Sequence, residues 1–152
     1  MRIVVAGIGN AYRSDDGAGL AVAERIGATV DGVDVIACEQ EPLRLLDAWK
    51  GADLTLVVDA VSSGAKPGTI HRFDASDDAL PATVFRGSTH ALGVGEAIEL
   101  ARTLGRLPGR VLVFGIEGER FSAGDRLTPA VADAVERVAS ELREEARCTS
   151  VR

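Results

Sequence analysis

The chain has 152 residues, of which 46% are hydrophobic and 26% charged, and its net charge is −6. These values predict one folded domain over residues 1–152, and the negative charge argues against a nucleic-acid partner, because phosphate binding needs clustered lysine and arginine. No apolar run reaches the roughly 18 residues of a membrane span, and the two cysteines, Cys38 and Cys148, form no CxxC motif. We therefore expect a cytoplasmic protein without a signal peptide or a membrane partner.

Short apolar runs alternate with helical patterns in the first part of the chain. Apolar and β-branched residues predict strands at Arg2–Gly7, Val33–Ala37 and Leu54–Ala60. Helical spacing predicts helices from about Asp16 to Ile26 and from Pro42 to Gly51. The third of these strands is almost wholly apolar, which predicts a central position in a sheet.

A turn-rich stretch separates the third strand from a fourth. The segment SSGAKPG, residues 62–68, is a turn cluster, and Thr69–Ala75 alternates with period two, as a half-exposed strand near an edge does. Because the connection is too short for a helical crossover, we expect this strand to run antiparallel to the one before it.

The rest of the chain continues the alternation. We predict a loop over Ser76–His90, a helix over Ala91–Leu104, a strand within Gly109–Gly118 and a long amphipathic helix over Arg126–Arg147 with Thr128 as its N-cap. Strands that alternate with helices predict an α/β fold. We expect a three-layer sandwich of the phosphorylase/hydrolase-like kind, in which helices cover both faces of a mainly parallel, five-stranded mixed sheet.

The loop after the first strand, GIGNAYRSDDGAGL, contains a glycine pattern and two adjacent acids. A dinucleotide-binding loop needs a third glycine where Tyr12 stands, and acids at a helix start repel a pyrophosphate. Gly7 and Gly9 are expected to let the backbone turn off the strand. Ser14 or Asp15 can cap the following helix, which explains only one of the two acids.

Three polar residues are expected at the edge of the sheet where parallel strands end. Asp16 follows the first strand, Asp59 ends the third, and His90 precedes a predicted helix. Each is readily explained by itself as a cap or a hydrogen-bonding loop residue, but ligands of open α/β sheets gather at this edge. Two carboxylates and an imidazole suit a divalent metal such as nickel, zinc, manganese or iron. Their joint placement favours a metal-binding catalytic site.

Other reactive residues give weaker patterns. The serines lack a G-x-S-x-G elbow. Cys38 and His90 form an alternative nucleophile and base, although a cysteine directly after a strand is typical of a core. His71, in the predicted edge strand, is interpreted as structural. Glu117 and Glu119 end the fifth strand and are candidates for a supporting role.

These motifs together resemble the hydrogenase maturation proteases, which trim a C-terminal extension from the large subunit of [NiFe] hydrogenases. GIGNAYRSDDGAGL is similar to the family's first signature, and LVVDAVSSGAKPGTIHRF to its third strand and hairpin. STHALGV and FGIEGERFSAGDRLTPAVADAV resemble its last two segments. The resemblance covers nearly the whole chain.

The resemblance implies a nickel-recognising, metal-dependent endopeptidase of aspartic type. Its metal-binding and catalytic residues correspond to Asp16, Asp59 and His90. The metal is the nickel already inserted in the substrate, with other divalent metals as substitutes in vitro. The implied partner is the large-subunit precursor, and we expect a monomer or a weak homodimer.

The chain departs from the family pattern after the second strand. The family often has D-G-G-T there, whereas this chain has CEQEP over Cys38–Pro42. Glu39, Gln40 or Glu41 are candidates for the role of that loop. A nickel-sensing or chaperone-like binding module without peptidase activity is the alternative function, and a nucleotide-binding protein is a further one.

Overall fold

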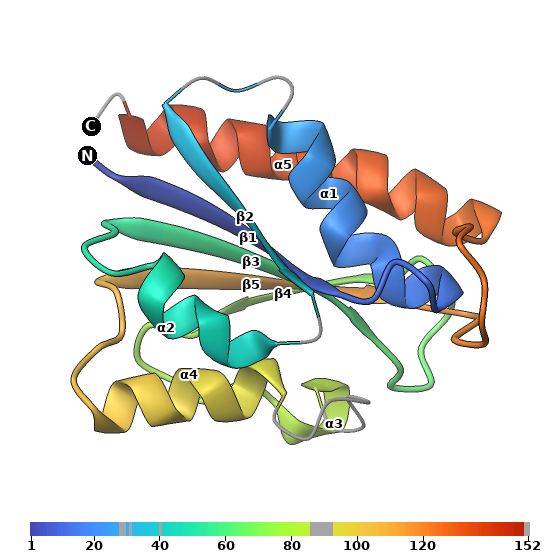
Figure 1. Cartoon of the computed structure of the whole chain (residues 1–152), viewed down its shortest axis with the longest axis horizontal. Helices are drawn as coiled ribbons and strands as arrows, with labels where there is room; N and C mark the ends of the chain where they lie inside the picture. The colour runs from blue at the N-terminus through green and yellow to red at the C-terminus, as the bar shows by residue number, and fades with distance from the viewer. Residues whose placement is uncertain (28–29, 31, 40, 86–92, 151–152) are drawn as a thin grey trace.

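The computed structural model describes residues 1–27, 30, 32–39, 41–85 and 93–150. A five-stranded sheet lies between two layers of helices (Figure 1). Its strands, in spatial order, are β2 (Val33–Glu39), β1 (Ile3–Gly9), β3 (Leu54–Val61), β5 (Arg110–Glu117) and β4 (Ile70–Asp74). The predicted three-layer α/β sandwich with a mainly parallel, mixed sheet is confirmed.

Strand directions follow the lengths of the connections. β1 pairs in parallel with β2 and β3, and β3 pairs in parallel with β5. β4 pairs antiparallel with β5 at the edge of the sheet. The predicted direction of the fourth strand and the central position of β3 are therefore confirmed, although β4 takes β5 as its partner and not β3.

Helices cover both faces of the sheet (Figure 1). One face carries α1 (Ala18–Gly27) and α5 (Pro129–Ser150), and the other carries α2 (Leu45–Ala48), α3 (Ala82–Phe85) and α4 (Val94–Thr103). Two 3₁₀ turns, η1 (Ser14–Gly17) and η2 (Pro42–Arg44), precede α1 and α2. Each face has its own apolar core, because alternate residues of a strand point to opposite sides.

Several elements differ from their predicted bounds. The helix expected over Pro42–Gly51 divides into η2 and the short α2, and α3 forms within the stretch expected to be a loop. Within the described residues the helix after that stretch begins at Val94, and the long helix runs from Pro129 to Ser150. No helix in the described part of the chain is long and apolar enough to cross a bilayer.

Glycines let α1 approach the sheet very closely. A Cβ atom on Gly19 would lie 2.3 Å from the carbonyl oxygen of Val58 and 2.4 Å from that of Ile8. A Cβ atom on Gly7 would lie 2.3 Å from the carbonyl oxygen of Gly19. Gly7 therefore serves helix–strand packing and not the expected turn. The turn is made by Gly9, whose φ of +148° favours glycine.

Candidate active site at the carboxyl edge of the sheet

The loop after β1 folds back tightly and carries Asp16 to the edge of the sheet. The backbone N–H of Asn10 donates to the carbonyl oxygen of Asp16 over 3.2 Å, and a Cβ atom on Gly9 would lie only 2.0 Å from that oxygen. Asp16 itself lies in η1, which packs against β3, and it is only 6% exposed. Its Oδ2 atom pairs with the guanidinium of Arg13 at 3.8 Å. These contacts fix the backbone of Asp16 at this edge of the sheet.

Asp59 lies near the carboxyl end of β3 and is 5% exposed. It shares a face of the sheet with Val57, which packs in the core beneath α2 and α4. Burial, and then the negative charge of Asp16, raise the pKa of Asp59 well above its ordinary value. Such a carboxyl group favours the neutral form until a cation compensates it.

The structure therefore brings two of the three predicted site residues together. His90 lies outside the described residues. Among the residues that the structure describes, no group of three or more His, Cys, Asp or Glu side chains is placed to hold a metal ion. The three-ligand set of Asp16, Asp59 and His90 stays a prediction, supported by the electrostatic coupling of its two acids.

Asp15 is buried and binds a distant segment of the chain. Its Oδ2 atom accepts hydrogen bonds from the backbone N–H groups of Glu119 and Arg120, both at 2.9 Å. Thr128 donates its N–H to Oδ1 and its hydroxyl to Oδ2, both at 2.8 Å. Burial alone would raise the pKa of Asp15, but these donors outweigh it and hold the pKa below its ordinary value.

Asp15 was expected to cap the helix that follows it, and this prediction is wrong. No side chain caps η1, the turn that contains Asp15. Asp15 instead ties the loop after β1 to the segment before α5, and the hydroxyl of Thr128, the expected N-cap of α5, donates to Asp15. Ser14 strengthens the same connection. Its N–H donates to the carbonyl oxygen of Gly124 and its hydroxyl to the carbonyl oxygen of Ser122, both at 2.8 Å.

A second buried carboxylate, Glu117, anchors the β3–β4 connection. Its Oε2 atom accepts the N–H of Ser63 at 2.8 Å, and its Oε1 atom accepts the hydroxyl of Ser63 at 2.5 Å. The Nε2 atom of His71 lies 3.1 Å from Oε1. These contacts agree with a supporting role for Glu117 and a structural role for His71, which stay predictions. The side chain of Glu119 is exposed.

The Ser63–Glu117–His71 cluster was not visible in the sequence as a unit. Its members lie on three different elements, and only the sheet register places them side by side. Glu117 pairs with Val61 in the β3–β5 ladder, and β4 brings His71 opposite Gly115. The one available sequence signal was an acid closing an otherwise apolar strand, since a buried acid needs partners.

Cys38 does not have the properties of a nucleophile. The residue is fully buried in the core between the sheet and α2. Burial raises the pKa of its thiol to about 11, so the reactive thiolate is scarcely present at neutral pH. The alternative site built on Cys38 and His90 therefore loses its nucleophile.

The Cys38–Pro42 loop contains two exposed acids, Glu39 and Glu41. Glu39 ends β2 beside Gly9, the last residue of β1. Glu41 pairs with Arg44 in the same turn at 4.0 Å. Gln40 lies outside the described residues. Of the three candidates for the role of this loop, Glu39 is thus the one placed beside the end of β1.

Fold and site together define an α/β protein with a coupled pair of buried carboxylates at the carboxyl edge of its sheet. The family model of the hydrogenase maturation proteases matches residues 21–145. The hydrogenase expression/formation protein HupD of Rhodobacter capsulatus is 32% identical over 99% of this chain and 73% of its own length. The hydrogenase 2 maturation protease of Escherichia coli strain K12 is 29% identical over 95% of this chain and 92% of its own.

Solved structures of hydrogenase maturation proteases are also similar to this chain. The hydrogenase maturating endopeptidase HybD from E. coli is similar with a TM-score of 0.77 and 27% identity, over 95% of this chain and 94% of that one. The [NiFe] hydrogenase maturation protease HycI from Thermococcus kodakarensis is similar with a TM-score of 0.73 and 27% identity, over 94% and 90% of the two chains. The chain belongs to the hydrogenase maturation protease family, and it is therefore a protease.

Proposed function

We propose that this chain is the endopeptidase that removes the C-terminal extension of a [NiFe] hydrogenase large-subunit precursor. Membership of the family supports this reaction, and one of the similar solved structures is named as a [NiFe] hydrogenase maturation protease. The observation that carries the proposal is the buried pair of Asp16 and Asp59 at the edge of the sheet where such folds bind ligands.

The site fits a divalent cation carried by the substrate. Asp16 and Asp59 are both buried, and the charge of Asp16 opposes ionisation of Asp59. A divalent ion held by both carboxylates would compensate this repulsion, and their oxygen atoms together with the imidazole of His90 would suit nickel. Because the pair has no thiolate ligand, we expect a weak site that is filled when the precursor presents its own nickel.

The residues of this chain then have separate roles in a metal-dependent reaction of aspartic type. Asp16 is held by its loop and by Arg13 and meets the ion as a carboxylate. Asp59, whose pKa is raised, would hold the ion in its ionised form after releasing its proton to water. The bound ion supplies Lewis-acid polarisation of the scissile carbonyl. Glu117 and Asp15 keep the two neighbouring loops in place.

The experiment compares nickel-loaded and nickel-free large-subunit precursor, each incubated with the purified chain and analysed by intact mass spectrometry. The proposal expects loss of one C-terminal peptide from the nickel-loaded precursor only. Binding without any shortening would favour the non-catalytic, nickel-sensing module. Equal cutting of both precursors would show that nickel is not recognised.

A further inference from the structure

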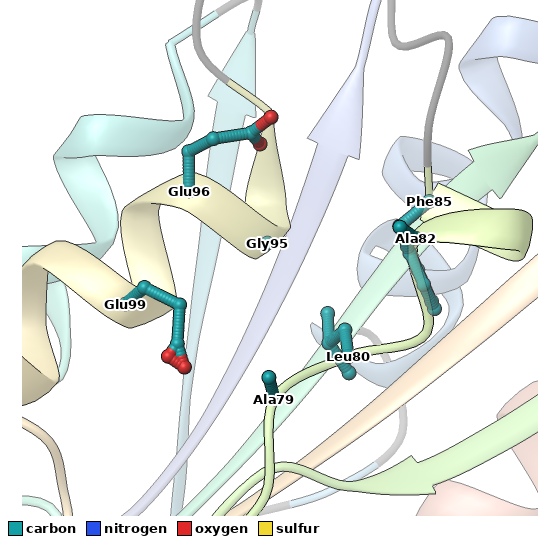
Figure 2. Close-up of a pocket in the computed structure, with 7 residues that line it drawn as sticks. All are labelled: Ala79, Leu80, Ala82, Phe85, Gly95, Glu96 and Glu99. Carbon is teal, nitrogen blue, oxygen red and sulfur yellow. The ribbon is translucent and has the colours of Figure 1, made fainter.

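A cavity of about 310 Å³ opens between α4 and the segment that contains α3 (Figure 2). Leu80 and Phe85 form an apolar wall, extended by the small side chains of Ala79 and Ala82. Glu96 and Glu99 line the opposite side from α4, and Figure 2 shows both glutamates across the opening from that wall. The cavity therefore combines an apolar wall with a negatively charged one.

Arg102 fixes the shape of this cavity. Its guanidinium donates to both carboxylate oxygens of Glu99, at 3.0 and 3.1 Å. The same group donates to the carbonyl oxygens of Ala75 and Ser76, both at 2.8 Å. Arg102 thus ties α4 to the chain that leads into the apolar wall, and it compensates the charge of Glu99.

The carboxylate of Glu96 is accessible to a ligand. Its side chain is exposed, and it makes no hydrogen bond or ion pair with any residue that the structure describes. It lies in the first turn of α4, where a carboxylate also stabilises the helix dipole. That role leaves the carboxylate oxygens accessible on the side of the cavity, so a bound cation is compatible with it.

The combination suits the side chain of a lysine or an arginine. Such a side chain packs its methylene groups on apolar surface while its charged head stays at the rim. Here the methylene groups would lie on Leu80 and Phe85, and the head would pair with Glu96. An aromatic ring in the wall also favours a cation, whereas an anionic side chain would be repelled by Glu96.

The cavity adjoins the site that contains Asp59. The Cζ atom of Phe85 lies 3.3 Å from the position that a Cβ atom on Gly115 would take. Gly115 is the register partner of Asp59 in the β3–β5 ladder. The ring of Phe85 therefore covers the strand residue directly beside Asp59, which places the cavity next to the candidate site.

We propose that this cavity is a specificity subsite that binds one lysine or arginine side chain of the polypeptide substrate, with Glu96 as its charged partner. The inference rests on the proposed protease function and adds a residue that selects the substrate.

The test measures kcat and KM for precursor trimming by the wild type, Glu96→Gln and the control Glu24→Gln. Glu24 is an exposed glutamate on α1, on the other face of the sheet. We expect Glu96→Gln to raise KM about fivefold, as a partly exposed ion pair does, with kcat within twofold of wild type. Glu24→Gln should leave both constants unchanged, and the melting temperatures of all three proteins should agree within a few degrees.

Variants of the substrate identify the lysine or arginine that pairs with Glu96. They also distinguish failure of the subsite from failure of the proposed protease function. Lysines and arginines near the cleaved end of the precursor are changed to glutamine one at a time. One of these changes should raise KM for the wild type by the same factor and add nothing in Glu96→Gln, as in a double-mutant cycle. If Glu96→Gln trims with wild-type KM, or every substrate change acts equally on both enzymes, the subsite is refuted while the protease function stands. If the wild type trims no precursor, the proposed function itself fails.

Discussion

The carboxyl groups of Asp16 and Asp59 lie close enough for the charge of one to oppose ionisation of the other, although both are almost wholly buried. One acid is held by the tight loop after β1 and the other by the central strand of the sheet. A fold keeps such a pair at a cost in stability. The pair is therefore best explained by what it binds.

Asp59→Asn should stabilise the apo protein at neutral pH and abolish trimming. Because the pKa of Asp59 is raised in the folded state, the folded protein holds this proton more tightly than the unfolded chain does. The contribution of Asp59 to stability is therefore present at low pH and is lost as the pH rises from about 4 through the raised pKa. The gain in melting temperature of Asp59→Asn should grow from pH 4 to pH 7. A melting temperature at pH 7 below that of the wild type would contradict this explanation.

Asp15→Asn should mainly reduce stability, whereas Asp16→Asn should mainly reduce activity. Asp15 accepts four hydrogen bonds from the segment before α5. An asparagine cannot accept all of them, so Asp15→Asn should lower the free energy of unfolding by about 2 kcal/mol, the scale of a hydrogen bond to a charged group. Asp16→Asn should leave stability nearly unchanged and reduce kcat at least about 100-fold, if the carboxylate meets the ion. Urea unfolding and precursor trimming, measured on both variants, check the division.

The pH dependence of Asp15 has the sign opposite to that of Asp59. Its folded-state pKa is depressed, so its stabilisation is present above its unfolded pKa and is lost as the pH falls below about 4. The wild type should therefore lose its advantage over Asp15→Asn in acid. A stability difference that is the same at pH 3 and pH 7 would show that the charge of Asp15 is not what holds the loop.

Gly19→Ala tests the close contact of α1 with the sheet. The added Cβ atom would lie 2.3 Å from the carbonyl oxygen of Val58, and neither backbone can move without disturbing β3 or α1. We expect a loss of about 3 kcal/mol or more, at the upper end of overpacking effects. Gly95→Ala is the matched control, because nothing lies within 4 Å of the new atom. Equal stability of the two variants would mean that the contact is not as tight as the structure shows.

Cys38 should resist alkylation and be dispensable for activity. It is buried with a thiol pKa of about 11, whereas Cys148 is exposed. Iodoacetamide at neutral pH should therefore label Cys148 and spare Cys38 in peptide mapping, because the thiolate is the reactive form. Cys38→Ala should keep trimming within a few-fold of wild type. Loss of trimming by a folded Cys38→Ala protein would restore the cysteine to the mechanism.

Local patterns in the sequence were sufficient for the sheet and for the positions of two candidate site residues, Asp16 and Asp59. An apolar run that ends in an acid placed Asp59 at the carboxyl end of a central strand. The short connection after it predicted the antiparallel β4. Distant partners were not predictable in this way. Asp15 binds Thr128, which is 113 positions away, and its local pattern indicated only a helix cap. Likewise, no spacing in the chain indicated that Gly7 accommodates Gly19.

Trimming of nickel-loaded precursor by Asp16→Asn, Asp59→Asn and His90→Ala tests the central claim most directly. Each variant is first shown to be folded by its circular dichroism spectrum and its melting temperature. The metal-site account predicts that all three lose trimming by at least about 100-fold, while Glu39→Gln, at the same edge of the sheet, retains measurable cutting. Wild-type rates from a folded Asp16→Asn or His90→Ala protein would contradict the account.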